Sequence, residues 1–260
     1  MSAAAPPRPD ELGGWLRLLL TPGVGSGTAR RLLAAFGPPP AIFGQSPQAL
    51  GQVVPAAVAR ALAAEPPGLP EQLARTSDWL GADPGARHVL PLGHAFYPPG
   101  LLALEDPPVL LYALGRAEQL ALAAPAVAMV GSRHPTPQGL LNARQFARAL
   151  AQAGWIVVSG LAAGIDAAAH QGALEGAQDM APVPGLATIA VVGTGLDRVY
   201  PRAHQALAHA IARQGVLLSE YAIGTPPLAA HFPRRNRLIA GLSLGTLVVE
   251  AALQSGSLIT

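Results

Sequence analysis

The chain of 260 residues contains no cysteine and no lysine. Without cysteine it has no disulfide, no thiol nucleophile and no Cys-ligated zinc, and this composition fits a reducing cytoplasm. Without lysine it has neither a Schiff-base lysine nor a phosphate loop of the Walker type, which requires one. Charged residues make up only 12% of the chain, whereas half of the residues are hydrophobic. Such a chain can form one large domain or two smaller ones.

Other classes of protein are also disfavoured. The N-terminus has no basic segment followed by an apolar stretch, so we expect no signal peptide. Proline and glycine interrupt the long uncharged runs, so we expect no membrane span. The seven histidines form no H-E-x-x-H pattern and no close acidic cluster, so we expect no metal ion.

The positive charge lies in the second half of the chain. The net charge is only +2, but residues 121–260 hold nine arginines and six acidic residues, against eight and nine in residues 1–120. This distribution predicts a positive field around the second half, which favours a polyanionic ligand.

We predict four segments along the chain. Residues 1–9 form a disordered tail, 10–80 a small helical domain, 81–125 a connecting region that starts the α/β domain, and 126–260 the α/β domain itself. Within this last segment, short hydrophobic runs that are typical of buried strands alternate with helical stretches. The runs are Val127–Val130, Trp155–Val158, Thr188–Val192, Val216–Leu218 and Leu247–Val249. The alternation predicts an α/β fold with a mostly parallel, doubly wound sheet, whose glycine loops open on one ligand-binding edge.

Residues 231–237 carry the densest group of nucleic-acid-binding side chains. The segment reads His231-Phe232-Pro233-Arg234-Arg235-Asn236-Arg237. Guanidinium groups fit phosphate oxygens, and an aromatic ring can stack on an unpaired base. We therefore predict a single-stranded nucleic-acid site here. A subunit interface or an internal ion pair with Glu220 or Glu250 is the alternative interpretation.

Two glycine loops precede predicted helices. Gly131-Ser132-Arg133 follows the first strand, where backbone N–H groups, the hydroxyl and the guanidinium could donate to phosphate. A plain glycine turn with a surface arginine is the alternative. After Gly160, Asp166 and His170 lie four residues apart on one helical face. They could form an acid–base pair, but we expect Asp166 to satisfy N–H groups at the helix start and His170 to pack in the core.

Two motifs match enzyme patterns only in part. In Gly193-Thr194-Gly195 the third glycine of a dinucleotide fingerprint is replaced by Arg198. The segment 241–245 matches G-x-S-x-G, but a helix is predicted before it and a strand after it, the reverse of the hydrolase arrangement.

The first half contains a glycine turn between two predicted helices. Gly23 and Gly25 lie in this turn, and Arg30 and Arg31 follow it. The pattern resembles a helix-hairpin-helix, which holds DNA phosphates without reading bases. We predict a secondary DNA contact at these four residues, with a plain helical turn as the alternative.

Several motifs together, in the same order, resemble the DprA/Smf family, the DNA-processing proteins A of natural transformation. They are Val130-Gly131-Ser132-Arg133, Val158-Ser159-Gly160-Leu161-Ala162, Gly164-Ile165-Asp166, Ala169-His170, Ala190-Val191-Val192-Gly193-Thr194-Gly195, Tyr200-Pro201, Ser219-Glu220-Tyr221, Phe232-Pro233, Arg235-Asn236-Arg237, Glu250-Ala251 and residues 255–260. The resemblance spans most of residues 88–260.

The resemblance implies an extended Rossmann-like domain that binds single-stranded DNA, with double-stranded DNA as a second candidate ligand, and that has no catalytic activity. It further implies a cytoplasmic homodimer that protects incoming DNA and helps to load RecA, with no cofactor and no membrane association. The helical first half resembles a sterile-alpha-motif-like domain. The DNA-binding residues that we expect are Gly131, Ser132, Arg133, Gly160, His231, Phe232, Arg234, Arg235, Asn236 and Arg237.

The chain departs from its relatives in two ways. Relatives often have a lysine shortly before the Phe-Pro pair, where this chain has only Arg234 or His231 as a substitute. Relatives also continue beyond Thr260, so we expect a domain truncated at its C-terminal end. The alternative function is a nucleotide-processing enzyme, because Gly245-Thr246 followed by Glu250 resembles hydrolases of the lysine-decarboxylase-like group.

Overall fold

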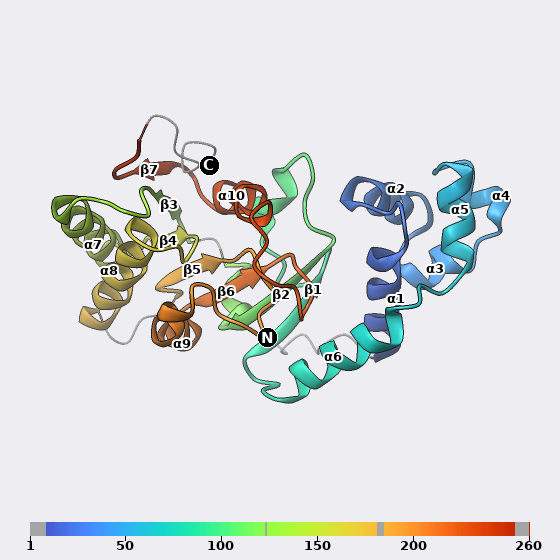
Figure 1. Cartoon of the computed structure of the whole chain (residues 1–260), viewed down its shortest axis with the longest axis horizontal. Coiled ribbons are helices and arrows are strands. Elements are labelled where there is room, and N and C mark those ends of the chain that lie inside the picture. Colours follow the sequence, from blue (N-terminus) through green and yellow to red (C-terminus); the bar gives the residue numbers. More distant parts are fainter. Residues whose placement is uncertain (1–8, 123, 181–184, 253–259) are drawn as a thin grey trace.

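A computed structural model describes residues 9–122, 124–180, 185–252 and 260 of the chain. Figure 1 shows an elongated molecule with a helical unit at one end and an α/β domain at the other. In the described part, no helix is long and apolar enough to cross a membrane.

Six helices precede the first strand in the described residues. They are α1 (Pro9–Leu20), α2 (Ser26–Phe36), α3 (Pro39–Phe43), α4 (Pro47–Leu50), α5 (Ala56–Ala63) and α6 (Leu69–Gly81). Leu18, Leu32, Ile42 and Leu62 are almost fully buried in the core of the helical unit. Pro9, which we predicted to end a disordered tail, is already helical, whereas residues 1–8 lie outside the described residues.

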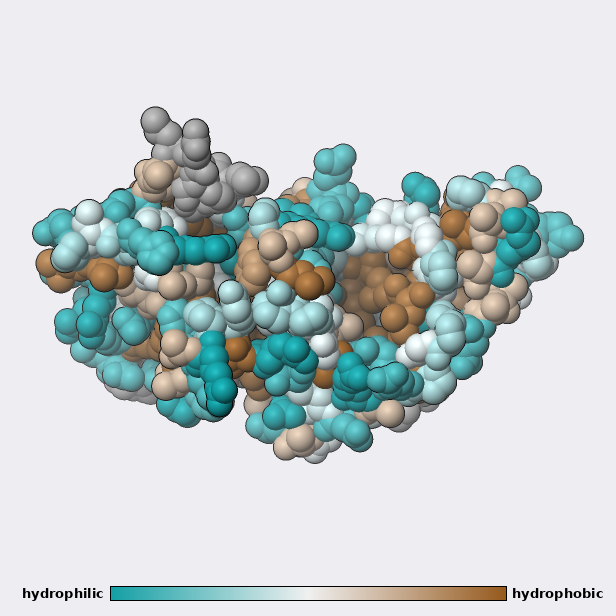
Figure 2. Space-filling view, viewed as in Figure 1, coloured by the Kyte–Doolittle hydropathy of each residue, from teal (hydrophilic) through white to brown (hydrophobic). Residues whose placement is uncertain are grey.

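Two of these helices also pack against the sheet. Leu12 and Leu16 of α1 and Trp79 of α6 share a core with Tyr112, and the Trp79 and Tyr112 rings meet edge to face. Between the two lobes, Figure 2 shows a hollow lined by hydrophobic residues. The Arg30 guanidinium donates a hydrogen bond to the Glu105 carbonyl, which joins α2 to the α/β domain.

The described residues form a seven-stranded sheet in the order β1-β2-β6-β5-β4-β3-β7. The strands are β1 (Arg87–Pro91), β2 (Leu110–Gly115), β3 (Ala126–Val130), β4 (Ile156–Ser159), β5 (Thr188–Val191), β6 (Val216–Ser219) and β7 (Thr246–Val248). Strands β3 to β7 are parallel to their neighbours in this group, and β1 and β2 are antiparallel. The mostly parallel sheet and the Rossmann-like α/β fold that we predicted are therefore confirmed.

Helices cover both faces of the sheet. The remaining helices are α7 (Pro137–Gln152), α8 (Ile165–Asp179), α9 (Gln205–Gln214) and α10 (His231–Gly241), with short 3-10 turns η1 (Pro99–Ala103), η2 (Ala117–Gln119) and η3 (Arg202–His204). Helices α7 and α8 pack on Met129 and Val157, whereas α10 packs on Val130 and Val158. Because successive strand residues face opposite sides, these neighbours place α10 on the face opposite α7 and α8.

The chain reverses its direction across the sheet at one point. It steps from β3 through β4 and β5 to β6, and α10 then carries it back to β7 on the other side of β3. In open α/β sheets, ligands bind outside the carboxyl ends of the strands at such a reversal. The topology therefore predicts a ligand-binding site at the loops that follow β3 and β7.

His170 lies in the core, as expected. It is fully buried on α8, and its Nδ1 lies 2.8 Å from the Thr188 hydroxyl, which donates to the Val157 carbonyl. Burial lowers the pKa of His170 to about 3, and the positive charges of Arg235 and His204 add to this effect. The side chain joins α8 to β5 as a neutral imidazole.

We predict that His170 makes the protein sensitive to acid. Between about pH 6.5 and pH 3 the unfolded chain binds a proton at this histidine that the folded chain does not, so this contribution to stability falls as the pH is lowered, by up to about 1.4 kcal/mol per pH unit. Urea unfolding of His170→Gln should show a shallower loss of stability between about pH 7 and pH 5 than the unmodified chain. The exposed His209→Gln is the control. An unchanged slope in His170→Gln would contradict the assignment.

Candidate nucleic-acid interface

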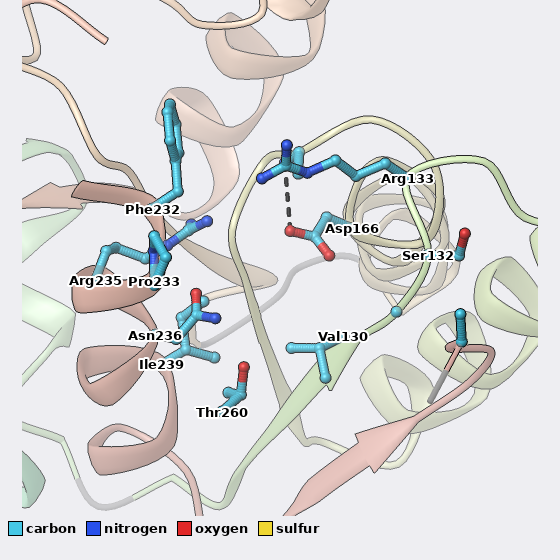
Figure 3. A pocket seen from close by; sticks show the side chains of 13 residues that line it. Val130, Ser132, Arg133, Asp166, Phe232, Pro233, Arg235, Asn236, Ile239 and Thr260 are labelled. Atoms are coloured by element: carbon cyan, nitrogen blue, oxygen red, sulfur yellow. Dashed lines mark hydrogen bonds between the residues drawn. The ribbon is translucent and has the colours of Figure 1, made fainter. Parts of the chain in front are cut away.

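A pocket of about 470 Å³ opens at the reversal point of the sheet. Its walls come from the end of β3, the loop after β4, the first turns of α10 and the segment after β7 (Figure 3). Six of the predicted site residues line it, namely Gly131, Ser132, Arg133, Phe232, Arg235 and Asn236. The fold thus brings the Gly-Ser-Arg turn and the Phe-Pro-Arg-Arg-Asn-Arg segment, which lie about a hundred residues apart, to one cavity.

Chain packing explains part of the Gly-Ser-Arg turn without any ligand. A Cβ atom at Gly131 would lie within 3 Å of Ile165 and of the Glu250 carbonyl. The Ser132 N–H donates to that same carbonyl at 2.6 Å, so this amide is not available to a phosphate as we had predicted. The Ser132 hydroxyl accepts a bond from the His134 N–H at 3.1 Å, which leaves the hydroxyl proton for a ligand.

Arg133 carries the accessible positive charge of the pocket. Its side chain is exposed, and its guanidinium carbon lies 5.9 Å from the centre of the Phe232 ring. Figure 3 shows the guanidinium reaching over the pocket toward the Asp166 carboxyl. A guanidinium in this position can donate two parallel hydrogen bonds to a phosphate at the pocket mouth.

Asp166 has a structural role, but its hydrogen-bond donors lie in the loop before α8 and not in the first turn of the helix, where we had expected them. It lies in the first turn of α8, is 7% exposed and accepts hydrogen bonds from the Gly160 and Ala162 N–H groups at 3.1 and 3.3 Å. Burial raises the pKa of Asp166, an effect that the Arg235 guanidinium and these two N–H groups oppose. The sequence did not predict that this carboxyl would also line the pocket.

Arg235 is a buried wall of the pocket rather than an exposed phosphate ligand. It is 4% exposed, and its guanidinium donates to the Val191 carbonyl at the end of β5. Burial lowers the pKa of Arg235, and the Asp166 carboxylate opposes that shift. Gly160 does not line the pocket: a Cβ atom there would overlap the Arg235 guanidinium, so glycine makes room for the arginine.

Aromatic rings adjoin the charged groups. Phe232 is partly exposed at the start of α10, and its ring lies 5.4 Å from the ring of Tyr200, which is 49% exposed. Phe232 belongs to the first turn of α10, the end at which the helix carries its partial positive charge, and no described side chain caps this end. Tyr200 was not among the predicted site residues, because a lone tyrosine before a proline carries no sequence signal for stacking.

Besides Gly160, three more predicted site residues lie outside the pocket. Arg237 forms ion pairs with Glu220 at 2.5 Å and with Asp106 at 3.1 Å, so for this residue the internal ion pair that we considered as the alternative is correct. His231 stacks on Tyr221 with the ring centres 3.9 Å apart, and its Nδ1 lies 3.1 Å from the Gly193 carbonyl. Arg234 is exposed but does not line the pocket.

The helical hairpin is separate from this pocket. Gly23 and Gly25 are exposed in the turn between α1 and α2, and Arg31 is exposed on α2. Arg30 is engaged within the chain, at the Glu105 carbonyl. The secondary DNA contact therefore stays a prediction, with Arg30 as its weakest member.

The partial enzyme motifs have structural roles. The G-x-S-x-G segment joins α10 to β7, and the Ser243 hydroxyl donates to the Ile239 carbonyl, as expected for a chance match. Glu250, which the alternative function would place over a sugar phosphate, instead accepts from the Thr136 N–H and hydroxyl at the start of α7. Among the described residues, no group of three histidine, aspartate or glutamate side chains could hold a metal ion.

Known proteins share both the sequence and the fold. A family model described as DNA recombination-mediator protein A matches residues 88–260. Protein Smf of Escherichia coli is 48% identical over 174 residues, which are 66% of this chain and 44% of that protein. DNA processing protein DprA of Streptococcus pneumoniae is 46% identical over 164 residues, or 63% of this chain and 54% of that protein. The chain thus spans about half the length of these curated relatives.

Two solved structures resemble this one. The X-ray structure of DprA from S. pneumoniae matches with a TM-score of 0.68 and 32% identity over 96% of this chain and 81% of that chain. DNA processing protein A from Helicobacter pylori, whose structure concerns a unique single-stranded DNA binding mode, matches with a TM-score of 0.55 and 34% identity over 62% and 70%. The resemblance inferred from the motifs is thereby confirmed: the chain belongs to the DprA/Smf family of DNA recombination-mediator protein A.

Proposed function

We propose that the chain binds single-stranded DNA at the pocket between the β3 loop and α10. The observation that carries the proposal is the meeting of an exposed guanidinium, Arg133, with an accessible aromatic ring, Phe232, at the carboxyl edge of the sheet. The guanidinium would bind a backbone phosphate and the ring would stack on a base, a combination that tolerates any sequence.

The charge balance of the pocket supports an anionic ligand. Among the described side chains that line the pocket, Arg235 offsets the one carboxylate, Asp166, so Arg133 is left as the net positive charge of these side chains. The start of α10 adds the partial positive charge of a helix N-terminus. The single-stranded DNA named for the H. pylori relative has both the phosphates and the unpaired bases that this arrangement suits.

The cellular role that we propose follows from family membership. We propose that the protein acts in natural transformation and recombination, where it would cover incoming single strands and help to load RecA, as a homodimer in the cytoplasm. We propose no catalytic step, because Arg133, Phe232 and Asn236 would position a strand rather than cleave it. We also propose the domain limits that the sequence predicts, with a helical segment 10–80 and an α/β segment 126–260.

One prediction of the proposed function concerns the phosphate contact of Arg133. Arg133→Ala should weaken binding of a single-stranded oligonucleotide about 10-fold or more at low salt, since a charge-assisted hydrogen bond contributes roughly 1.5–3 kcal/mol. The slope of log affinity against log salt should become shallower by about 0.7, the value for one phosphate of a single strand. Fluorescence anisotropy at several salt concentrations measures both. Arg148→Ala is the matched control, because Arg148 is exposed on α7 and pairs with Asp179 outside the pocket. Equal affinities of Arg133→Ala and Arg148→Ala would refute this contact.

Another prediction of the proposed function concerns base stacking on Phe232. Phe232→Ala should weaken binding about 5-fold to 100-fold, because stacking of one base contributes roughly 1–3 kcal/mol. The salt slope should not change, since no charge is removed, and this separates the effect from that of Arg133→Ala. Phe232→Tyr keeps the ring and should bind nearly as well as the unmodified chain. A change in slope for Phe232→Ala, or equal loss in Phe232→Tyr, would argue against stacking. Thermal melting of both variants controls for the packing of the ring on Gly193.

A further inference from the structure

A second cavity rich in arginine lies between α6, β2 and α9. Its volume is about 590 Å³, and Arg87, Arg198 and Arg202 line it together with His209. Asp197 is the only carboxylate among the described residues that line it, so these residues have an excess of positive charge. None of these residues belongs to the pocket at the β3 loop.

The arginines of this cavity differ in how strongly the fold holds them. Arg87 is half-buried, donates to the Trp79 carbonyl at 2.8 Å and lies over the Trp79 ring. Arg198 pairs with Asp197 at 2.8 Å, and both side chains are partly exposed to solvent, so this pair contributes little and can be exchanged for a phosphate. Arg202 is exposed on η3. Two of the three guanidinium groups can therefore reach a ligand without disturbing the core.

One loop connects the two cavities. Residues 196–199 and Arg202 line the second cavity, and Tyr200, between them, points its ring at Phe232 of the first pocket. Arg133, Phe232 and Tyr200 thus form a continuous row of flat groups, with the Arg133 guanidinium 5.9 Å from the Phe232 ring and the Phe232 ring 5.4 Å from the Tyr200 ring. The ring of Tyr200 is half exposed although it carries a large apolar surface. Exposed aromatic rings beside positive charges are typical of surfaces that bind single-stranded nucleic acid, because the rings stack on bases and the charges bind phosphates.

We propose that a bound single strand leaves the Arg133–Phe232 pocket over the Tyr200 ring and continues into the cavity that contains Arg198 and Arg202. This inference rests on the proposed function, and it adds a direction and a second phosphate-binding area to it. Tyr200 stacks on a base at the crossing point, and Arg198 and Arg202 bind the phosphates beyond it. A short strand fills the first pocket only, whereas a longer strand reaches both cavities.

Oligonucleotides of two lengths test the path. Fluorescence anisotropy compares oligothymidines of about five and about 20 nucleotides, a span that brackets typical single-strand site sizes. The double variant Arg198→Ala/Arg202→Ala should bind the longer strand about 10-fold more weakly, with a salt slope shallower by about 1.4, and should bind the short strand as before. Arg213→Ala is the control, because Arg213 is exposed on the neighbouring helix α9 and lies outside the cavity.

Tyr200 is tested in the same assay. Tyr200→Ala should weaken binding of the longer strand about 5-fold or more without changing the salt slope, and Tyr200→Phe should restore binding. Unchanged affinity of both the double variant and Tyr200→Ala for the longer strand, while Arg133→Ala still weakens it, would overturn the path and leave the proposed function intact. An equal loss for the short strand in the double variant would also overturn the path. If Arg133→Ala weakens neither strand, the proposed function itself fails.

Discussion

The arrangement of this site depends on one buried group, the Arg235 guanidinium. It reaches from α10 across the carboxyl ends of the strands, donates to the Val191 carbonyl after β5 and lies against Gly160 after β4. Asp166 at the start of α8 supplies the opposite charge that a buried guanidinium needs. These contacts fix α10 against the sheet edge, and α10 in turn presents Phe232 and Asn236 to the pocket. Arg235 therefore shapes the site, while the neighbouring Arg133 remains accessible to a ligand.

Much of the fold could be predicted from the sequence. The five hydrophobic runs after residue 126 are all strands in the structure, and each strand begins and ends within one residue of its predicted limits. Short β-branched runs between glycine-rich loops have few other stable arrangements. The order of the strands could not be obtained in this way. The position of β7 beside β3 results from the long return of the chain through α10, and no local pattern encodes that contact.

The site was predicted less completely than the fold. Sequence position identified Gly131, Ser132, Arg133, Phe232 and Asn236, which the structure gathers in one cavity. It could not distinguish the environments of the three arginines of α10. Arg234 is exposed to solvent, Arg235 is buried, and Arg237 forms ion pairs with Asp106 and Glu220. A residue's burial depends on the helix phase relative to the sheet, which becomes known only when α10 is placed. Tyr200 was missed for a related reason, since its partner Phe232 lies 32 residues away in the chain.

The central claim is that a single strand occupies the pocket beside α10. Photocrosslinking with an oligonucleotide that carries 5-iodouridine, followed by mass spectrometry of the peptides, tests it directly, because this base reacts with an aromatic side chain on which it stacks. The account predicts adducts on Phe232, and on Tyr200 with longer strands. Adducts confined to the helical unit, residues 9–81, with none on Phe232, would contradict it.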